Sequence, residues 1–268
     1  MSSISITLVQ TQLFWEEKEA NLRQLEEKIN QLQQPTHVLV LPEMFNTGFS
    51  MRPEVLAEDM NGPTVEWMKR MAAEKRVILT GSLMVKEPKA DDPSAVHYYN
   101  RLLWMLPNGQ YGVYDKRHLF GYAGEDQHYT PGNKRLVASV NGWRFHLQVC
   151  YDLRFPVWAR QQSAAEPEYD VLLYVANWPE RRKHAWRTLL QARAIENQCY
   201  VIGVNRVGED GNNIAHSGNS MVVDPMGEVL YEKEQEEEVH TIVLSKEHLL
   251  TVRNKLPFLK DADNFLFR

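Results

Sequence analysis

Strand-like and helix-like segments alternate along almost the whole chain. Ile4 to Val9 is rich in apolar and β-branched residues, as in a strand, and Glu16 to Leu32 then carries leucine and isoleucine at spacings of three and four residues, as on one face of a helix. The same order returns with an expected strand at Val171 to Val175, a helix from about Arg181 to Asn197 and a strand at Tyr200 to Asn205. Because such helices and strands bury their apolar faces against each other, the alternation predicts a mixed α/β fold.

Other segments extend this pattern. Expected strands lie at His37 to Leu41, Val77 to Val85 and Trp143 to Val149, and expected helices at Val65 to Lys75 and near Val157 to Gln162. Two hairpins are predicted by turn residues between apolar runs. Their turns are Pro107-Asn108-Gly109, between Tyr98 to Leu106 and Gln110 to Asp115, and Asp224-Pro225-Met226-Gly227, between Asn219 to Val223 and Glu228 to Tyr231.

The composition is that of an ordinary folded chain. Of the 268 residues, 43% are hydrophobic and 24% are charged, and no linker rich in proline or serine divides them. We therefore expect one domain over residues 1–268, with a core of about residues 4–243. A C-terminal tail of about residues 246–268 is expected to pack on the core or on a partner subunit, because it contains the apolar residues Leu256, Phe258, Leu259, Phe265, Leu266 and Phe267.

Charge and cysteine content narrow the class further. The formal net charge is −5, and no basic stripe favours a nucleic-acid partner. The N-terminus does not have the pattern of a secretory leader, and no window of about 18 apolar residues predicts a membrane span. The only cysteines are Cys150 and Cys199, so a disulfide framework is not expected. These features favour a cytoplasmic protein without a membrane anchor.

Three reactive residues each follow an expected strand. Glu43 comes after His37 to Pro42, Lys116 after Val113 to Asp115, and Cys150 after Phe145 to Val149. In α/β folds, the ends of strands are the usual place for reactive groups. The three residues can meet only if their strands neighbour one another in space, and their spacing of 73 and 34 residues does not prove this.

A carboxylate, an ammonium group and a thiol together suit covalent hydrolysis of an amide. The carboxylate of Glu43 can take the proton of the Cys150 thiol, and the ammonium of Lys116 favours the thiolate. Attack on an amide carbon produces an oxyanion, for which Lys116 and the backbone N–H of Tyr151 are candidate donors. Glu43 can then activate water for deacylation. This chemistry requires neither a metal ion nor a cofactor.

Three blocks of sequence surround these residues: Leu41-Pro42-Glu43-Met44-Phe45, Tyr114-Asp115-Lys116-Arg117-His118-Leu119-Phe120 and Val149-Cys150-Tyr151-Asp152-Leu153-Arg154-Phe155-Pro156. In residues and in order they resemble the signature blocks of the nitrilase (carbon–nitrogen hydrolase) superfamily. The resemblance runs from about Ile4 to Val243. Two later stretches, Val175-Ala-Asn-Trp-Pro and Gln191-Ala-Arg-Ala-Ile-Glu-Asn-Gln, are similar to the bacterial YafV-type omega-amidases in particular.

The resemblance implies a four-layer αββα sandwich and a set of roles. It implies Glu43 as general base, Lys116 as oxyanion stabiliser and Cys150 as a nucleophile that forms a thioester. It also implies a second glutamate between the lysine and cysteine blocks, and Glu125 matches that position, with Tyr129 and Gly132 following at offsets of four and seven. Homodimers are usual in the superfamily, so a homodimer is expected here.

An omega-amidase hydrolyses the terminal amide of short oxo-dicarboxylic monoamides such as 2-oxoglutaramate and 2-oxosuccinamate, and releases ammonia. Such a substrate needs a cation for its distal carboxylate, and Arg154 is the candidate because a guanidinium binds a carboxylate through two parallel hydrogen bonds. The other candidate substrate-binding residues are Tyr151, Trp178, Phe45 and Tyr122, with Arg181 and Arg182 as further cations.

Several alternatives stay open at this point. A carbamoyl-amine hydrolase or a nitrilase would use the same three residues, and Arg154 could instead form a structural ion pair with Asp152. A non-catalytic interaction protein could keep the same fold. A metal-dependent amidohydrolase is disfavoured because no His-Glu-x-x-His or cysteine pair with zinc spacing occurs, and His118 and His128 are isolated. Cys199 lies outside every block and is expected to be a core residue.

Overall fold

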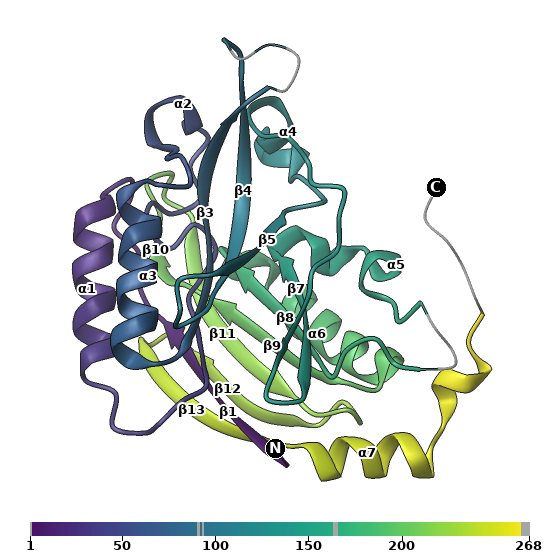
Figure 1. Ribbon diagram of the computed structural model, residues 1–268. Helices are drawn as coiled ribbons and strands as arrows, with labels where there is room; N and C mark the ends of the chain where they lie inside the picture. The colour runs from purple at the N-terminus through teal and green to yellow at the C-terminus, as the bar shows by residue number, and fades with distance from the viewer. Residues whose placement is uncertain (1, 90–91, 93, 163–165, 264–268) are drawn as a thin grey trace.

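The structure is a computed structural model that describes residues 2–89, 92, 94–162 and 166–263. Two β-sheets pack face to face, and helices lie on the outer face of each sheet (Figure 1). Three buried clusters mark the interfaces between the layers. The predicted four-layer αββα arrangement is therefore confirmed.

The first sheet has six strands in the order β13-β1-β2-β3-β4-β5. They are β1 (Ser3–Gln10), β2 (Val38–Val40), β3 (Ile78–Pro88), β4 (Val96–Met105), β5 (Tyr111–Asp115) and β13 (Glu238–Ser245). The first three run parallel, because helices α1 (Lys18–Asn30) and α3 (Pro63–Lys75) provide the crossovers between them. Strands β4 and β5 follow as antiparallel hairpins, and β13 pairs antiparallel with β1.

The second sheet has seven strands, with the order β10-β11-β9-β8-β7-β6 and β12 paired to β11. They are β6 (Val137–Val140), β7 (Trp143–Val149), β8 (Val171–Ala176), β9 (Tyr200–Asn205), β10 (Val207–Glu209), β11 (Ala215–Val223) and β12 (Val229–Glu234). At its centre β7, β8 and β9 are parallel and almost wholly buried. Their continuous apolar runs follow from this burial on both faces.

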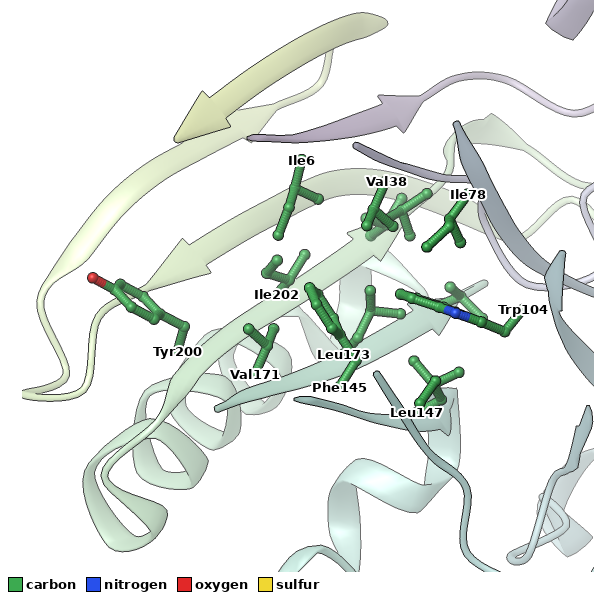
Figure 2. Close-up of a cluster of buried hydrophobic side chains, with 14 of the residues drawn as sticks. Ile6, Val38, Ile78, Trp104, Phe145, Leu147, Val171, Leu173, Tyr200 and Ile202 are labelled. Carbon is green, nitrogen blue, oxygen red and sulfur yellow. The ribbon is translucent and has the colours of Figure 1, made fainter. Parts of the chain in front are cut away.

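The core between the sheets follows the period of two residues along each strand. Ile4, Ile6 and Leu8 of β1 face the opposite sheet. Figure 2 shows Ile6, Val38 and Ile78 of the first sheet pointing toward the side chains of the second, among them Phe145, Leu147, Val171, Leu173 and Ile202. On the outer faces, α1 and α3 cover the first sheet and α6 (Lys183–Asn197) covers the second.

The other helices are short or differ from what the sequence predicted. The remaining helices are α2 (Pro53–Leu56), α4 (Glu125–His128), α5 (Pro156–Ala159) and α7 (Lys246–Lys255), and the 3-10 helices are η1 (Gly121–Ala123), η2 (Cys150–Arg154), η3 (Glu180–Arg182) and η4 (Phe258–Asp261). The helix expected near Val157 to Gln162 is only the single turn α5, and the one expected from Arg181 begins as η3 and becomes α6 at Lys183.

The C-terminal region packs on the core of its own chain. Leu249 of α7 is fully buried in the cluster between the sheets. Lys246 and Arg253 form ion pairs with the buried carboxylate of Asp170, with N–O distances of 2.6 and 3.2 Å. The expected tail residues Phe265, Leu266 and Phe267 lie outside the described residues. Within the described part of the chain, no helix has both the length and the apolar character needed to cross a bilayer.

Candidate active site

Reactive side chains gather where strands of both sheets end. Glu43 follows β2, Lys116 follows β5, and Cys150 follows β7 as the first residue of η2. Glu125 comes from the short helix α4 and joins them. Lys116 and Cys150 line a cavity of about 500 Å³. The structure therefore brings together the four residues that the sequence singled out for catalysis.

Lys116 is held between two carboxylates. Its Nζ lies 2.9 Å from Glu43 Oε1, and 3.0 and 2.9 Å from the two oxygens of Glu125. All three side chains are buried. Burial acts to lower the pKa of Lys116, but Glu125 and then Glu43 outweigh it, so the pKa lies above its ordinary value and the group is an ammonium ion.

The surroundings of the second glutamate, Glu125, also change its pKa. Burial raises the pKa of Glu125, Lys116 acts against this, and Glu43 adds to it. Glu125 Oε2 accepts a hydrogen bond of 2.6 Å from the backbone N–H of Phe120. Glu125 thus ties α4 to the loop that carries Lys116.

The surroundings of the Cys150 thiol raise its pKa. Burial raises its pKa well above the ordinary value, and Glu43 raises it further through its charge and as a hydrogen-bond acceptor, against the opposing effect of Lys116. Lys116 acts in the expected direction, toward the thiolate, but burial and Glu43 outweigh it. The thiol is hydrogen-bonded to a carboxylate that can accept its proton.

The turns that carry Glu43 and Cys150 have unusual backbone conformations. Cys150 and Met44, the residue after Glu43, both have φ of +43°, in the left-handed region that non-glycine residues rarely adopt. Such conformations persist only where surrounding contacts hold them, and they concentrate at functional sites. The turn at Met44 directly follows Glu43, and the turn at Cys150 directly follows β7. Each turn therefore lies next to a side chain that enters the site.

Asp152 is one of the contacts that hold the Cys150 turn. Its Oδ2 accepts hydrogen bonds from Tyr114 Oη at 2.7 Å and from the Val149 N–H at 3.0 Å. Its Oδ1 accepts the His118 N–H at 2.9 Å and lies 2.8 Å from His118 Nδ1. Asp152 is fully buried, so it binds the nucleophile turn to the loop of Lys116 and is not the partner of Arg154.

Two asparagines complete the site, and the sequence analysis did not assign them a role. Asn100 of β4 donates through Nδ2 to Glu43 Oε1 at 2.7 Å and to Glu125 Oε1 at 3.2 Å. Asn177, after β8, donates its backbone N–H to Glu43 Oε2 at 2.8 Å and its side-chain Nδ2 to the Glu43 carbonyl. The block Val175-Ala-Asn-Trp-Pro contains Asn177 and was a usable signal, whereas nothing local marks Asn100.

The expected substrate-binding residues divide into two groups. Arg154, Tyr151, Trp178 and Tyr122 line the cavity with Cys150. Phe45 does not, because its ring is fully buried in the core beneath α3, 5.9 Å from the ring centroid of Trp67. The expectation that Phe45 lines the cavity is therefore wrong. The turn at Met44 directs the Phe45 side chain away from the cavity.

The mouth of the cavity is cationic. The Arg154 guanidinium lies over the Trp178 ring at 4.9 Å, and Arg181 and Arg182, which also line the cavity, lie over Tyr122 and Phe120 at 6.0 and 5.1 Å. Among the residues that the structure describes, none of these arginines forms an ion pair with a carboxylate. The site therefore offers positive charge to an anionic ligand.

Cys199 serves as a contrast to Cys150. It is fully buried among apolar residues of the second sheet and α6, and burial raises its pKa to about 12. No group of three or more histidine, cysteine, aspartate or glutamate side chains in the described ranges has an arrangement that could hold a metal ion.

The fold and site agree with a family relationship over nearly the whole chain. A family model described as carbon-nitrogen hydrolase matches residues 5–249. The chain therefore belongs to the carbon–nitrogen hydrolase family, as its three sequence blocks predicted.

Individual relatives make the comparison more specific. The chain is 43% identical to a Yersinia enterocolitica protein named omega-amidase YafV, over 99% of each chain, and 30% identical to a Bacillus subtilis protein named 2-oxoglutaramate amidase, over 98% of this chain and 99% of the relative. A crystal structure of a CN-hydrolase superfamily protein from Xanthomonas campestris, with an arsenic adduct in its active site, is 40% identical, covers 100% of both chains and superposes with a TM-score of 0.94.

Proposed function

We propose that this protein is a cysteine-dependent omega-amidase. It hydrolyses the terminal amide of short oxo-dicarboxylic monoamides, such as 2-oxoglutaramate and 2-oxosuccinamate, to the dicarboxylate and ammonia. The observation that carries the proposal is a partly buried thiol beside a glutamate–lysine–glutamate cluster, at a cavity whose mouth has unpaired arginines. The similarity to proteins named omega-amidase and 2-oxoglutaramate amidase supports the same substrate class.

In the first half of the reaction, Glu43 takes the proton of the Cys150 thiol as the sulfur attacks the amide carbon. A carbon–sulfur bond forms and the carbonyl oxygen becomes an oxyanion, which the Lys116 ammonium and the Tyr151 N–H stabilise. Glu43 then passes its proton to the amide nitrogen. The carbon–nitrogen bond breaks, ammonia leaves, and the acyl group remains on Cys150 as a thioester.

In the second half, Glu43 acts as a base again. It takes a proton from a water molecule that attacks the thioester carbon, and the same donors stabilise the second oxyanion. The carbon–sulfur bond then breaks, the carboxylic acid is released, and the proton returns to the thiol. Glu125 holds Lys116 in place and charged through both half-reactions, and Asn100 orients the two glutamates.

Arg154 is the proposed partner of the carboxylate at the far end of the substrate. Cys150 and Arg154 are the first and last residues of η2, and both line the cavity. A 3-10 helix rises about 2 Å per residue, so Arg154 lies roughly 8 Å beyond Cys150 along the axis. That reach suits a short dicarboxylic chain whose amide end is at the thiol. Trp178, Tyr151 and Tyr122 form the walls around it.

The test compares ammonia release from 2-oxoglutaramate, 2-oxosuccinamate, a carbamoyl amino acid and a simple nitrile. We expect the two oxo-acid amides to be preferred, turnover to be lost in Cys150→Ala, and turnover to be retained in Cys199→Ala, which removes the thiol outside the site. Preference for the carbamoyl compound or the nitrile would keep the chemistry but overturn the substrate class. Absence of turnover with all four would overturn the omega-amidase proposal and favour a non-catalytic role.

The assembly and the compartment belong to the same proposal. We infer a homodimer, supported by exposed apolar side chains of two neighbouring elements: Ile195 of α6 and Met226, Val229 and Leu230 at the β11–β12 turn. We also infer a cytoplasmic location, supported by the two free thiols. Fractionation of cells with an antibody against the protein tests the location, and recovery outside the cytoplasmic fraction would overturn it.

A further inference from the structure

The three arginines at the cavity mouth are more than a single carboxylate needs. One guanidinium binds one carboxylate through two parallel hydrogen bonds, and Arg154 is assigned to that group. Arg182 and Arg181 remain, and they follow each other at the end of η3. Arg181 and Arg182 differ in the contacts that their side chains make.

Arg182 packs against aromatic side chains that line the cavity. Its guanidinium lies 5.1 Å from the centroid of the Phe120 ring, and the same ring packs at 4.9 Å against Tyr151, the residue after the nucleophile. Its carbonyl accepts a 2.9 Å hydrogen bond from Trp178 Nε1, while the Trp178 ring carries Arg154 at 4.9 Å. One tryptophan therefore positions both arginines.

Arg181 is held at the outer rim. Its side chain is exposed, and it lies 6.0 Å from the ring of Tyr122, which is itself 80% exposed. Arg182, by contrast, is partly buried, and this burial lowers the pKa of its guanidinium. Both arginines line the cavity, but only Arg182 packs on the ring that contacts Tyr151, the residue after the nucleophile.

The acids of the cavity wall are already engaged. Glu16 accepts hydrogen bonds from Ser50 Oγ and from Arg52, at 2.5 and 2.7 Å. Asp210 accepts the backbone N–H groups of Asn212 and Ile214. Among the described lining residues, the carboxylates Glu16 and Asp210 are outnumbered by the cations Arg52, Lys116, Arg154, Arg181 and Arg182. The cavity mouth therefore favours hydrogen-bond acceptors on the substrate and repels positively charged groups on it.

We infer that Arg182 is a specificity-determining residue that donates hydrogen bonds to the 2-oxo oxygen of the substrate, while Arg154 holds the adjacent carboxylate. This inference rests on the proposed omega-amidase function and assigns the residue that selects the group at carbon 2. A carbonyl oxygen at carbon 2 accepts a hydrogen bond from Arg182, whereas a methylene group there leaves the guanidinium without an acceptor. An ammonium group, as in the free amino acid, places a third cation between two guanidinium groups.

Three amides test this assignment, because they differ only at carbon 2: 2-oxosuccinamate, succinamate and asparagine. For the wild-type enzyme we expect kcat/KM to be highest for 2-oxosuccinamate and lowest for asparagine. In Arg182→Gln, kcat/KM for 2-oxosuccinamate should fall by about 10-fold or more relative to succinamate, because a hydrogen bond to a charged donor is lost. Arg182→Lys keeps the charge and should recover part of the preference.

Arg181→Gln is the matched control, since it removes the same charge from the neighbouring residue. It should change kcat/KM for 2-oxosuccinamate and succinamate by the same factor and leave their ratio in place. An unchanged ratio in Arg182→Gln, or an equal loss of the ratio in Arg181→Gln, would overturn the assignment. Equal turnover of 2-oxosuccinamate and succinamate by the wild type overturns this inference alone, whereas no turnover of either overturns the proposed function as well.

Discussion

At the scale of single residues, the main result is the protonation state of the nucleophile. A thiol surrounded by protein and next to the Glu43 carboxylate has a pKa well above its ordinary value, although Lys116 is close. The ammonium cannot overcome this because it is shared between Glu43 and Glu125. The site therefore begins with a thiol and a base, and the proton moves only when the substrate is attacked.

Replacing Glu43 by glutamine should separate thiol acidity from catalysis. The change removes the negative charge next to the thiol and leaves Lys116 charged by Glu125, so the pKa of Cys150 should fall. In a Cys199→Ala background, the midpoint of the pH profile for iodoacetamide labelling should move to lower pH, while ammonia release falls by about 100-fold or more with the loss of the base.

The matched control for this measurement is Asp126→Asn. Asp126 is an exposed carboxylate next to Glu125 in sequence, so the same carboxylate-to-amide change is made outside the cluster. It should leave the labelling midpoint where it is in the parent. A midpoint that stays or rises in Glu43→Gln would contradict the view that Glu43 suppresses the thiolate.

At the scale of secondary-structure elements, the short helix η2 carries the strain of the site. It begins at Cys150 with a left-handed backbone and ends at Arg154, so the nucleophile and the proposed carboxylate ligand share one element. The buried Asp152, the third residue of η2, holds this start by accepting the backbone N–H of Val149 and by joining η2 to the loop after Lys116.

The variant Asp152→Ala tests this role of η2. It leaves the buried donors of Tyr114, Val149 and His118 without an acceptor, so the free energy of unfolding should decrease by about 3 kcal/mol. At a temperature where the variant is still folded, kcat should fall at least about 10-fold, because the turn no longer holds the thiol toward Glu43. Denaturant titration and initial rates provide the two readouts.

Asp152→Asn provides the comparison for this variant. It keeps one acceptor oxygen and should lie between wild type and Asp152→Ala in both quantities. A loss of stability in Asp152→Ala with kcat unchanged would show that Asp152 only stabilises the fold and does not position η2.

At the scale of the whole molecule, the site and the proposed dimer surface lie on different layers. Cys150 and Glu43 lie where the ends of the two sheets meet, whereas Ile195 projects from the outer face of α6 and is 55% exposed. Gly227, at the β11–β12 turn, lies close to Ile195, so α6 and this turn are side by side, and Met226, Val229 and Leu230 near the turn are also exposed. Such a surface is typical of an interface between copies.

We predict a molar mass in solution of twice the 31.2 kDa of one chain, measured by light scattering. Ile195→Asp places a charge in the proposed interface and should shift the mass toward that of the monomer. Val55→Asp is the control, since Val55 is 61% exposed and lies on α2 at the other side of the fold (Figure 1). A monomeric wild type, or a dimer that tolerates Ile195→Asp, would argue against this interface.

Features with a local cause were predictable from the sequence. The strands and helices with clear apolar periodicity appear close to their expected positions, because that periodicity reflects which face is buried. Glu43, Lys116 and Cys150 stood out because each follows a strand. Strand β13 was not predicted, although Val239 to Leu244 is rich in β-branched residues; its place beside β1, at the opposite end of the chain, comes from the tertiary structure.

By itself, therefore, the sequence determined the fold class, the three reactive residues and the family. The tertiary structure alone decided that Asn100 reaches both glutamates, because β4 brings it there from between two hairpin partners. It also decided that Phe45 enters the core while Trp178 lines the cavity. The upward shift of the Cys150 pKa was decided in the same way, since a pKa depends on burial and on distances to charges that come from separate strands.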